Sequence, residues 1–441
     1  YDDVYQLGGC VRTYIQKCVV GGRTMCRDNI KHKVEGGKMA DYDGVSLYPS
    51  AMSRMTTELG GVLIGKPKLL TTLNYNWLKN NTDGYFIKIK IKSIGIKRHF
   101  SLISSVNDKG VRIFSNDVVN KEYYVDRTTL EDWITFHNIS FDIINGYYYD
   151  EGRNPKIGTV LEFLFNERIK KKAEENPIQE LYKLIMNASY GKSILKPINK
   201  ESKVLSNEKE LNQFIQKNYN FIIQYEKIYD SSKYYVEYHK SINEHFNNAS
   251  VGVEILSMSK RIMNEVMCLA EDEGLTAYYQ DTDSIHMIYD DVKVLKEKFK
   301  QKYHRELDGK QLGQFHIDFS LKDEDGNECE NVYAYKSIFL GKKCYIDCLR
   351  GTIKKGKKKG EIVEGYHIRM KGIPNSTIIY TAKEKKCNVY ELYEKLYNGE
   401  KITFDLLEGG KRCNMKFNNN LSVSYLVDFQ RELFFGKNVP L

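Results

Sequence analysis

The chain has 441 residues, and its 67 lysines and arginines outnumber its 58 aspartates and glutamates, giving a formal net charge of +9 that permits a polyanionic partner without requiring one. Its apolar runs fall well short of the about 20 residues that cross a bilayer, so the sequence excludes a membrane-spanning protein. Nine cysteines, an odd number without a Cys-x-x-Cys pair, are typical of free thiols in a reducing, intracellular compartment.

The amino-terminal part of the sequence predicts strands and turns. Short apolar runs separated by glycine pairs predict loops and short strands over residues 1–39. A strand is expected to run into Asp43, followed by a turn and a helix that begins near Pro49. Strand signals then dominate residues 53–156, where Tyr85–Ile91 alternates apolar and basic side chains.

The clearest helical signal is a hairpin over residues 158–192. Thr159 and Glu162 have the spacing of a capping box, which predicts the start of a first helix. Asn176 and Pro177 suit the cap and the first position of a second helix. Two helices joined by so short a turn are expected to lie antiparallel.

Basic side chains are expected to gather on this hairpin. The antiparallel pairing places Lys171 beside Lys183, with Arg168 one turn earlier on the first helix. On the second helix Lys183, Asn187 and Tyr190 follow at i, i+4 and i+7, so they share a face. Like charges aligned across a hairpin suit a bound anion such as a triphosphate, and a solvated polar face is the simpler alternative.

The remaining elements alternate helices and strands. In chain order the sequence predicts a helix and two strands over 199–248, a long helix over 252–272, a strand over 276–280, further strands from about residue 333, a lysine-rich turn over 354–360 and a helix near Tyr390. The lysine-rich turn suits contact with backbone phosphates, and a freely solvated turn is an equal alternative.

Two acidic segments lie at strand ends far apart in the sequence. Asp281 and Asp283 occupy a turn between two apolar strands, and Asp43 ends an earlier strand. Carboxylates crowded on one turn repel each other by about 1–4 kcal/mol, and a divalent cation such as Mg²⁺ reverses that sign. Asp-Thr-Asp-Ser is also an ordinary tight-turn sequence, so a plain hairpin tip is the alternative. His286, on the strand after the turn, is interpreted as a packing residue and not as a metal ligand.

Three segments together resemble motifs A, B and C of the family B DNA polymerases, in the order found in that family. The segments are Asp43-x-x-Ser46-Leu47-Tyr48-Pro49-Ser50, Lys183-x-x-x-Asn187 with Tyr190-Gly191, and Tyr279-x-Asp281-Thr282-Asp283-Ser284. The resemblance implies an α+β protein with the right-hand polymerase fold, which has an antiparallel-sheet palm, helical-hairpin fingers and a small thumb.

The chain is similar in particular to the protein-primed branch of this family, found in phages, viruses, linear plasmids and virus-like transposons. Its finger hairpin is short, and the segment between motifs A and B is longer than two finger helices require. The resemblance implies six segments. Residues 1–52 would be a template-contact segment and the first part of the palm, 158–192 the fingers, 250–348 the palm with the acidic turn, and 349–441 the thumb and carboxyl-terminal region. Between them, 53–157 and 193–249 would be insertions resembling the first and the second terminal-protein region.

The resemblance also implies a role for each motif residue. The catalytic carboxylates would be Asp43, Asp281 and Asp283, with two Mg²⁺ ions, which Mn²⁺ can replace, held by Asp43, Asp283 and the Val45 carbonyl. The nucleotide would contact Tyr48, Arg168, Lys171, Lys183, Asn187 and Tyr190, with Tyr48 excluding ribonucleotides. The DNA would contact Gly21, Gly22, Gly191, Lys343 and Tyr345.

The implied function is a DNA-directed DNA polymerase that adds deoxynucleotides to a primer 3′-hydroxyl. Its partners would be template and primer DNA, dNTPs and a terminal protein, in the host cytoplasm or at a viral replication site. Too few residues precede Asp43 for a 3′–5′ exonuclease domain, so we expect a polymerase core that works without proofreading. Val19 stands where the family has Tyr, and Ala188 where it has Ser, so one template contact and the nucleotide pocket are expected to differ.

Other functions are weighed on the same residues. A family B core that uses a nucleic-acid primer carries the same motifs, and only the product joined to a terminal protein would separate the two. A non-catalytic nucleic-acid-binding module is disfavoured because all three aspartates and Lys183 are present. A reverse transcriptase is disfavoured because its acidic turn is Tyr-x-Asp-Asp, whereas this chain has Asp281-Thr282-Asp283 after Tyr279.

Overall fold

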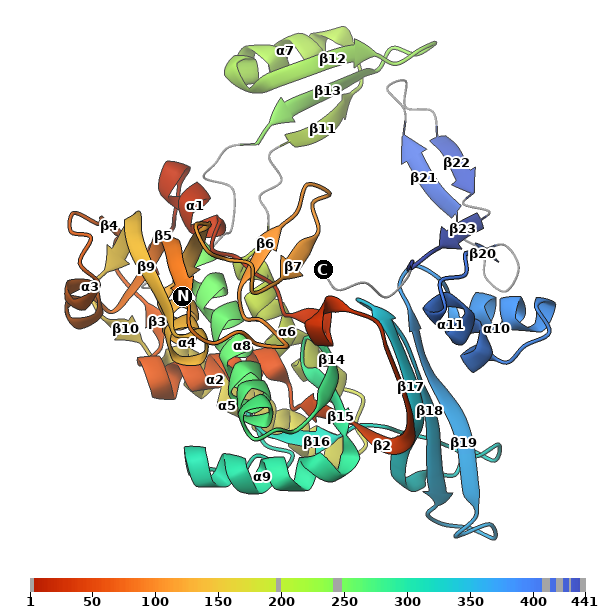
Figure 1. Cartoon of the computed structure of the whole chain (residues 1–441). Helices are drawn as coiled ribbons and strands as arrows, with labels where there is room; N and C mark the ends of the chain where they lie inside the picture. Colours follow the sequence, from red (N-terminus) through yellow and green to blue (C-terminus); the bar gives the residue numbers. More distant parts are fainter. Residues whose placement is uncertain are drawn as a thin grey trace.

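A computed structural model describes residues 4–195, 200–240, 248–406, 413–417, 423–427 and 430–436 of the chain. Figure 1 shows a long curved antiparallel sheet beside a body of helices, with a small α/β unit set apart at the top of the view. The mixture of helices and antiparallel sheets confirms the predicted α+β class. Among the described residues, no helix combines the length and the apolarity that crossing a membrane needs.

The largest sheet in the described chain has eight strands. Their order is β1-β14-β15-β2-β17-β18-β19, and β16 also pairs with β2. The strands are β1 (Thr24–Cys26), β2 (His32–Gly44), β14 (Ala277–Asp281), β15 (Ser284–Ile288), β16 (Phe315–Ile317), β17 (Cys329–Gly341), β18 (Cys344–Ile353) and β19 (Ile362–Met370). Because the amino-terminal part of β2 pairs with β17 and its carboxyl-terminal part pairs with β15 and β16, this strand joins the two halves of the sheet.

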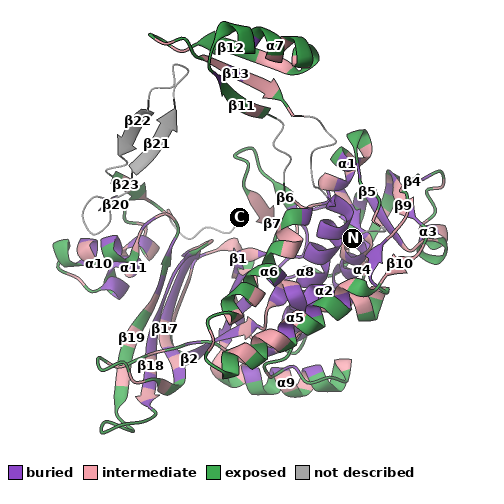
Figure 2. Ribbon diagram, turned by 180° about the vertical axis from the view of Figure 1, so that it is seen from behind, coloured by how far each residue is buried: buried purple, intermediate pink, exposed green. Residues whose placement is uncertain are grey.

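Three helices pack beside this sheet: α2 (Leu47–Leu59), α8 (Ala249–Asp272) and α9 (Tyr289–Tyr303). The predicted long helix is confirmed as α8, which is purple over most of its length in Figure 2 because other elements surround it. Two buried ion pairs tie α8 to earlier segments, Glu254 with Arg153 at 2.8 Å and Arg261 with Asp132 at 2.8 Å. A buried charge is tolerated when it is paired, so these contacts fix the orientation of α8.

After α2 ends at Leu59, the rest of residues 53–156 forms the predicted strand-rich block, with a four-stranded sheet in the order β4-β9-β5-β8. Its elements are β3 (Val62–Leu63), β4 (Lys68–Leu69), α3 (Tyr75–Asn81), β5 (Gly84–Ile94), β6 (Ser104–Val106), β7 (Arg112–Phe114), β8 (Glu122–Asp126), α4 (Arg127–His137), β9 (Ile139–Tyr149) and β10 (Arg153–Asn154). The strand predicted at Tyr85–Ile91 lies within β5. The sequence did not predict α4, whose buried Leu130 and Trp133 pack into the core of this block.

The helical hairpin is present as α5 (Lys156–Ala173) and α6 (Gln179–Ser193), which pack against each other. The predicted capping box is wrong, because α5 begins three residues before Thr159, directly after Pro155. The second helix begins at Gln179, two residues later than the prediction with Pro177 at its first position. Asn176 lies in the turn between the helices, where its Oδ1 accepts from the Ile178 N–H at 3.0 Å. Glu175, with a φ of 53°, reverses the chain direction.

Residues 200–239 form a small unit with a three-stranded sheet in the order β11-β13-β12. Its elements are β11 (Lys200–Leu205), α7 (Glu208–Asn218), a 3-10 turn (Tyr219–Phe221), β12 (Ile222–Lys227) and β13 (Tyr234–His239). The predicted helix and two strands are confirmed, whereas β11 was missed because its first four residues are polar. Figure 1 shows this unit apart from the eight-stranded sheet, which is called the palm sheet below.

The carboxyl-terminal region packs against the palm through helices and short strands. Its elements are α10 (Asn375–Glu384), α11 (Val389–Tyr397), β20 (Ile402–Asp405), β21 (Cys413–Phe417), β22 (Val423–Val427) and β23 (Gln430–Leu433). The helix predicted near Tyr390 is α11, which begins with a capping box between Asn388 and Glu391. The lysine-rich turn lies, as predicted, between β18 and β19.

The amino-terminal segment contains a helix that the sequence analysis did not predict. Where loops and short strands were expected, α1 (Gly9–Gln16) forms and is followed by β1 and a 3-10 turn (Arg27–Asn29). Ile15 is fully buried in a cluster that includes Ala249 and Val253 of α8. The expectation of loop was wrong because tertiary packing of one apolar face stabilises this short, glycine-led helix.

Candidate active site

Two aspartates from distant segments meet at the palm sheet. Asp43 lies near the end of β2, and Asp283 lies in the turn between β14 and β15. Ser284 pairs with Asp43 across the two strands, and the Gly44 N–H donates to the Asp283 carbonyl at 2.7 Å. The strand pairing therefore brings these two carboxylates together.

The electrostatic environment of these carboxylates favours a cation. Burial raises the pKa of Asp43 to about 8, and the charge of Asp283 adds to the rise. Asp41 and Asp318 raise it further. Burial also raises the pKa of Asp283. A divalent cation stabilises such crowded carboxylates, and clustered carboxylate oxygens are the ligands that Mg²⁺ prefers, so the donor set at this place fits Mg²⁺.

The turn after Asp43 sets the start of α2 and the position of the Val45 carbonyl. Ser46 takes a left-handed conformation, with a φ of 44°, directly before the helix. The Val45 carbonyl accepts a hydrogen bond from Ser50 Oγ at 2.7 Å. Because a carbonyl oxygen has two lone pairs, this bond orients the oxygen and leaves one lone pair for a ligand.

Two tyrosines stack beside the acidic turn. The rings of Tyr48 on α2 and Tyr190 on α6 lie with centroids 4.0 Å apart and planes at 19°. Burial raises the pKa of the Tyr48 hydroxyl, and so do Tyr190 and Asp283, which places that hydroxyl near the turn. The stack therefore joins the fingers hairpin to the palm at the candidate site.

The predicted basic residues of the hairpin each have a polar partner within the protein, and the placement of Lys171 beside Lys183 stays a prediction. Arg168 reaches the palm, where its Nη1 donates to Ser46 Oγ at 3.1 Å, and its buried Nε has no hydrogen-bond partner in the described chain. Lys171 pairs with Glu174 of the adjoining turn at 2.8 Å, and Lys183 with Glu180 of its own helix at 3.8 Å. Arg168 is thus held at the palm, whereas each lysine is held on the hairpin by a nearby glutamate.

The other predicted residues of α6 face outward. Asn187 is exposed, one turn after Lys183 on the same face of the helix. Gly191 follows near the end of α6, and a Cβ placed there would meet no atom within 4 Å. The surface beside these residues is therefore open to a large ligand.

The glycine pair of the predicted template segment lies against the acidic turn. A Cβ on Gly22 would come within 2.4 Å of Thr282 Cγ2, and the Thr282 N–H donates to the Arg23 carbonyl at 2.9 Å. Gly21 is exposed, and a Cβ placed there would meet no atom within 4 Å. Gly22 is thus required by close packing on the acidic turn, and Gly21 borders the space next to it.

Asp281 has a partner within the protein. Lys343 Nζ forms an ion pair with the Asp281 carboxylate, and the Lys343 N–H donates to the Tyr279 hydroxyl at 2.8 Å. Lys343 lies in the tight turn between β17 and β18, where its φ is 56°. Asp281 is therefore neutralised by Lys343, whereas like charges surround Asp43.

Tyr345 does not reach the surface, contrary to the expectation that it contacts DNA. Its side chain is 3% exposed and packs against Tyr279 at 4.8 Å and His286 at 5.0 Å between ring centroids. Lys343 is exposed because it lies in the turn before β18, whereas Tyr345 lies within β18 and its side chain enters the core. Only Lys343 of this pair is accessible to a ligand.

The sequence analysis missed two further aspartates of the site. Asp318 directly follows β16, and its N–H donates to the Asp41 carbonyl at 2.9 Å. Both carboxylates raise the pKa of Asp43. A signal was present for Asp318, because an alternating Phe315-His316-Ile317 strand ends in an aspartate, as the strand before Asp43 does.

An antiparallel sheet that gathers aspartates beneath a helical hairpin is the arrangement of the right-hand polymerase fold. Residues 2–271, more than half of the chain, match the family described as DNA polymerase type B, organellar and viral. The chain belongs to this family.

Solved structures share the fold at low sequence identity. The chain is similar to phi29 DNA polymerase complexed with primer-template DNA and incoming nucleotide substrates, with a TM-score of 0.59 and 15% identity over 97% of this chain and 63% of that one. The structure of phi29 DNA polymerase complexed with single-stranded DNA gives a TM-score of 0.59 and 15% identity over 96% of this chain and 62% of that one. The chain thus spans less than two thirds of the length of phi29 polymerase. A comparison with curated protein sequences found no match.

Proposed function

We propose that the chain is a DNA-directed DNA polymerase that adds deoxynucleotides to a primer 3′-hydroxyl. The observation that carries this proposal is the meeting of Asp43 and Asp283, which are held together by the pairing of β2 with β15. Membership of the type B polymerase family supports it. So does the fold shared with phi29 DNA polymerase, which is known in a complex with primer-template DNA and nucleotides.

Asp43, Asp283 and the Val45 carbonyl would hold two Mg²⁺ ions, and Mn²⁺ would substitute for them. When bound, such ions lower the pKa of an attacking hydroxyl and stabilise the charge on a leaving pyrophosphate. The chain's own residues set up this chemistry: the Gly44–Asp283 hydrogen bond fixes the two strand ends, and Lys343 neutralises Asp281. Mn²⁺ prefers the same oxygen ligands as Mg²⁺, which is why it would replace Mg²⁺ here.

The nucleotide would lie between the acidic turn and α6. Tyr48, supported from one side by the ring of Tyr190, would form the floor of the sugar pocket and collide with a 2′-hydroxyl. Arg168 is already held at the palm by Ser46. Exposed ion pairs on helices are weak, so Lys171 and Lys183 can leave their glutamates for a triphosphate, whose charge attracts them more strongly.

DNA would pass over the outer side of the acidic turn. Gly21 borders this turn, and Lys343 is exposed next to it, where a cation can meet a backbone phosphate. The open space around Gly191 leaves room for the template base on the fingers side. Asn187, exposed on the same helix, would line the nascent base pair.

We infer that synthesis starts from the hydroxyl of a terminal protein. Residues 53–157 add a four-stranded sheet unit, and the described part of residues 193–249 adds an α/β unit set apart from the palm sheet. A second macromolecule could contact both units. Incubation with a candidate terminal protein and one labelled dNTP should give a covalent protein–nucleotide product. A chain that extends nucleic-acid primers but never forms that product would favour the family B core with a nucleic-acid primer.

The cysteines support an intracellular, reducing setting, such as host cytoplasm or a viral replication site, as part of this proposal. Cys18, Cys26, Cys268, Cys344 and Cys348 are buried and carry free thiols. Burial raises the pKa of the Cys26 and Cys268 thiols to about 12 each, which keeps both in the unreactive thiol form.

Template-directed primer extension tests the polymerase proposal directly. With Mg²⁺, a primer-template and four dNTPs, the chain should copy the template sequence, and Asp283→Asn should lose at least about 10³-fold in rate because a metal ligand is removed. Asp142→Asn is the matched control, since Asp142 is an exposed aspartate paired with Lys92 on the distant β5–β9 sheet. Equal rates for Asp283→Asn and the unaltered chain would refute the site assignment.

A further inference from the structure

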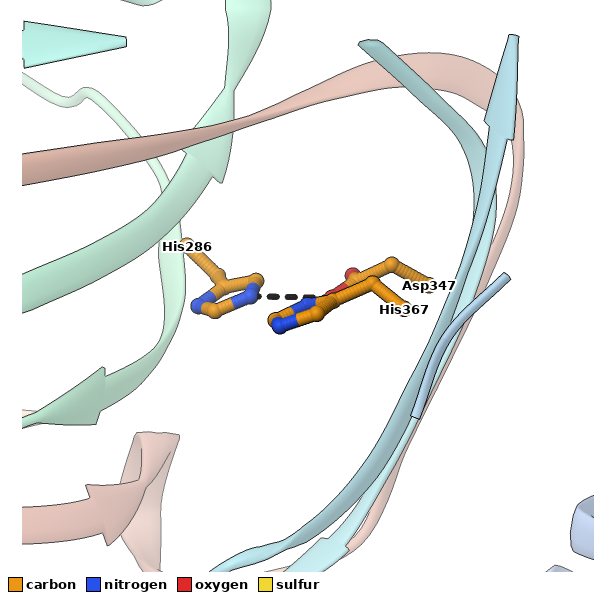
Figure 3. A group of neighbouring side chains, drawn as sticks. All are labelled: His286, Asp347 and His367. Atoms are coloured by element: carbon orange, nitrogen blue, oxygen red, sulfur yellow. Dashed lines mark hydrogen bonds and ion pairs between the residues drawn. The ribbon is translucent and has the colours of Figure 1, made fainter. Parts of the chain in front are cut away.

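Five neighbouring strands of the palm sheet each contribute one polar side chain to a cluster below the acidic turn. In sheet order, β15, β2, β17, β18 and β19 supply His286, Asp41, Ser337, Asp347 and His367. Figure 3 shows the side chain of His286 and those of Asp347 and His367 on separate strands of the curved sheet, pointing toward one another. Strand pairing sets this arrangement, because His286 pairs with Asp41 and Asp347 pairs with both Ser337 and His367.

Three donor atoms of this cluster converge on one point. Asp347 Oδ2 lies 3.0 Å from His286 Nε2 and 3.1 Å from His367 Nδ1, and one ligand atom from each of the three residues lies within 4.8 Å of the other two. Ligands bound to zinc at about 2.0–2.2 Å in a tetrahedron are about 3.3 Å apart. The three atoms therefore need only small shifts to hold one ion.

The side chains next to the three donors have the positions of the residues that orient the ligands of a metal ion. Ser337 Oγ donates to Asp347 Oδ1 at 2.7 Å, which leaves Oδ2 for the cluster. The other ring nitrogen of His286, Nδ1, faces Asp41 Oδ1 at 3.8 Å, and within the described chain neither buried atom has a hydrogen-bond partner. Metal-bound imidazoles characteristically direct their second nitrogen at a carboxylate, which fixes the ring and its tautomer.

The charge and access of the cluster also fit a cation. Asp41 and Asp347 are buried carboxylates. Both imidazoles contact the same oxygen of Asp347, whereas a buried ion pair needs only one partner for that oxygen. The side chain of His367 is 24% exposed, so an ion and a water ligand can approach from its side. Two histidines and one carboxylate with an open position are ligands of divalent transition metals.

We propose that His286, Asp347 and His367 bind a divalent transition-metal ion of the zinc type. This site is separate from the all-oxygen acidic turn and does not depend on the proposed polymerase function. Its ion would join β15, the strand that follows the acidic turn, to β18 and β19, which lead toward the carboxyl-terminal region. The sequence gives no hint of it, because the three ligands are far apart in the chain and come together through strand pairing.

Metal content and cobalt spectroscopy test the proposal without any activity assay. The chain is stripped with chelating resin, loaded with Zn²⁺ in excess Mg²⁺, and passed through gel filtration before zinc is measured by mass spectrometry. We expect about one zinc per chain in the unaltered protein and in Asp283→Asn, and at least a tenfold loss in His367→Ala. His239→Ala, which removes an exposed histidine of the separate α/β unit, should keep the zinc.

Co²⁺ loading of the unaltered chain tests the site without any variant, so the result does not depend on whether His367→Ala folds. Co²⁺ bound by two imidazoles and a carboxylate gives visible absorption bands stronger than those of the hydrated ion, and Zn²⁺ should displace them stoichiometrically. Zinc below about a tenth of an ion per chain without such bands would overturn the proposal, leaving a metal-free hydrogen-bonded cluster. Equal zinc in His367→Ala and the unaltered chain would also overturn it.

Discussion

The palm sheet carries two groups of aspartates whose surroundings are opposite. At the acidic turn Asp43 faces other carboxylates, and burial together with these charges raises its pKa to about 8. Deeper in the sheet, the imidazoles of His286 and His367 outweigh the effect of burial and hold the pKa of Asp347 well below its usual range. Among the described residues no cationic side chain offsets the charges around Asp43, whereas Asp347 has two imidazoles as hydrogen-bond partners.

The two groups lie on the same strands, so the difference arises from a few residues. Asp41 precedes Asp43 by two positions on β2 and shares its face of the sheet, yet Asp41 is opposite His286 whereas Asp43 is opposite Ser284. A carboxylate opposite an imidazole has a charged or polar partner within the sheet. A carboxylate opposite a serine and beside other carboxylates becomes a site that an external cation must complete.

Removing the charge of Asp347 should give the largest change in stability. Asp347→Asn leaves two imidazoles facing a neutral amide in a buried position, and breaking a buried ion pair costs about 3–5 kcal/mol in the free energy of unfolding. Urea denaturation of metal-stripped protein measures the change. Glu364→Gln, which breaks an exposed pair with Arg350 on the same two strands, is the control and should change stability little. Similar small effects for both variants would contradict the comparison.

Changing the tyrosine beside the acidic turn should alter sugar selection. Tyr48→Val removes the ring that stacks on Tyr190, so the preference for dNTPs over rNTPs should fall by about 100-fold. Single-nucleotide incorporation kinetics give the ratio of kcat/KM values. Tyr48→Phe keeps the ring and should keep the preference, and unchanged selectivity in Tyr48→Val would remove the proposed gate.

A buried histidine outside the palm, His137, should give a smaller change in stability, because its surroundings keep its imidazole neutral. His137 Nε2 accepts from the Leu102 N–H at 3.0 Å, and its Nδ1 donates to the Ile96 carbonyl at 2.7 Å, so the ring is buried in its neutral form. Burial lowers its pKa to about 4, below the ordinary value of about 6.5. The unfolded chain therefore binds the proton more readily, and the stability that His137 contributes above pH 6.5 is lost as the pH falls toward 4.

Denaturation at several pH values measures this effect. Between pH 6.5 and 5 the free energy of unfolding should fall by about 2 kcal/mol more in the unaltered chain than in His137→Gln. His239→Gln, at an exposed histidine, should follow the unaltered chain. Parallel curves for His137→Gln and the unaltered chain would show that His137 is not held neutral.

Local patterns predicted the elements that carry the motifs. The strand into Asp43, the Asp281–Asp283 turn and the helix at 252–272 depend on residues next to one another, and each is present. The predicted start of α5 was wrong because the Thr-x-x-Glu spacing of Thr159 and Glu162 occurs within helices as well as at their first residues. Local spacing cannot distinguish those two positions.

Contacts across strands could not be predicted from the chain. The ion pair of Lys343 with Asp281, the packing of Gly22 on Thr282 and the burial of Tyr345 all depend on how β1, β14 and β18 are placed in the sheet. The same holds for Asp318, which joins the acidic site because β16 pairs with β2. A site built on one sheet from many segments is visible only once the strand order is known.

The central claim is that Asp43 and Asp283 act together on the same metal ions, and a double-variant comparison of primer-extension rates tests it most directly. Asp43→Asn, Asp283→Asn and the double variant are compared in single-turnover reactions with Mg²⁺. Residues that act as a unit give losses that do not multiply, so the double variant should be about as slow as the slower single variant. A double variant slower by the product of the two single losses would show that the two carboxylates work independently, and would contradict the account.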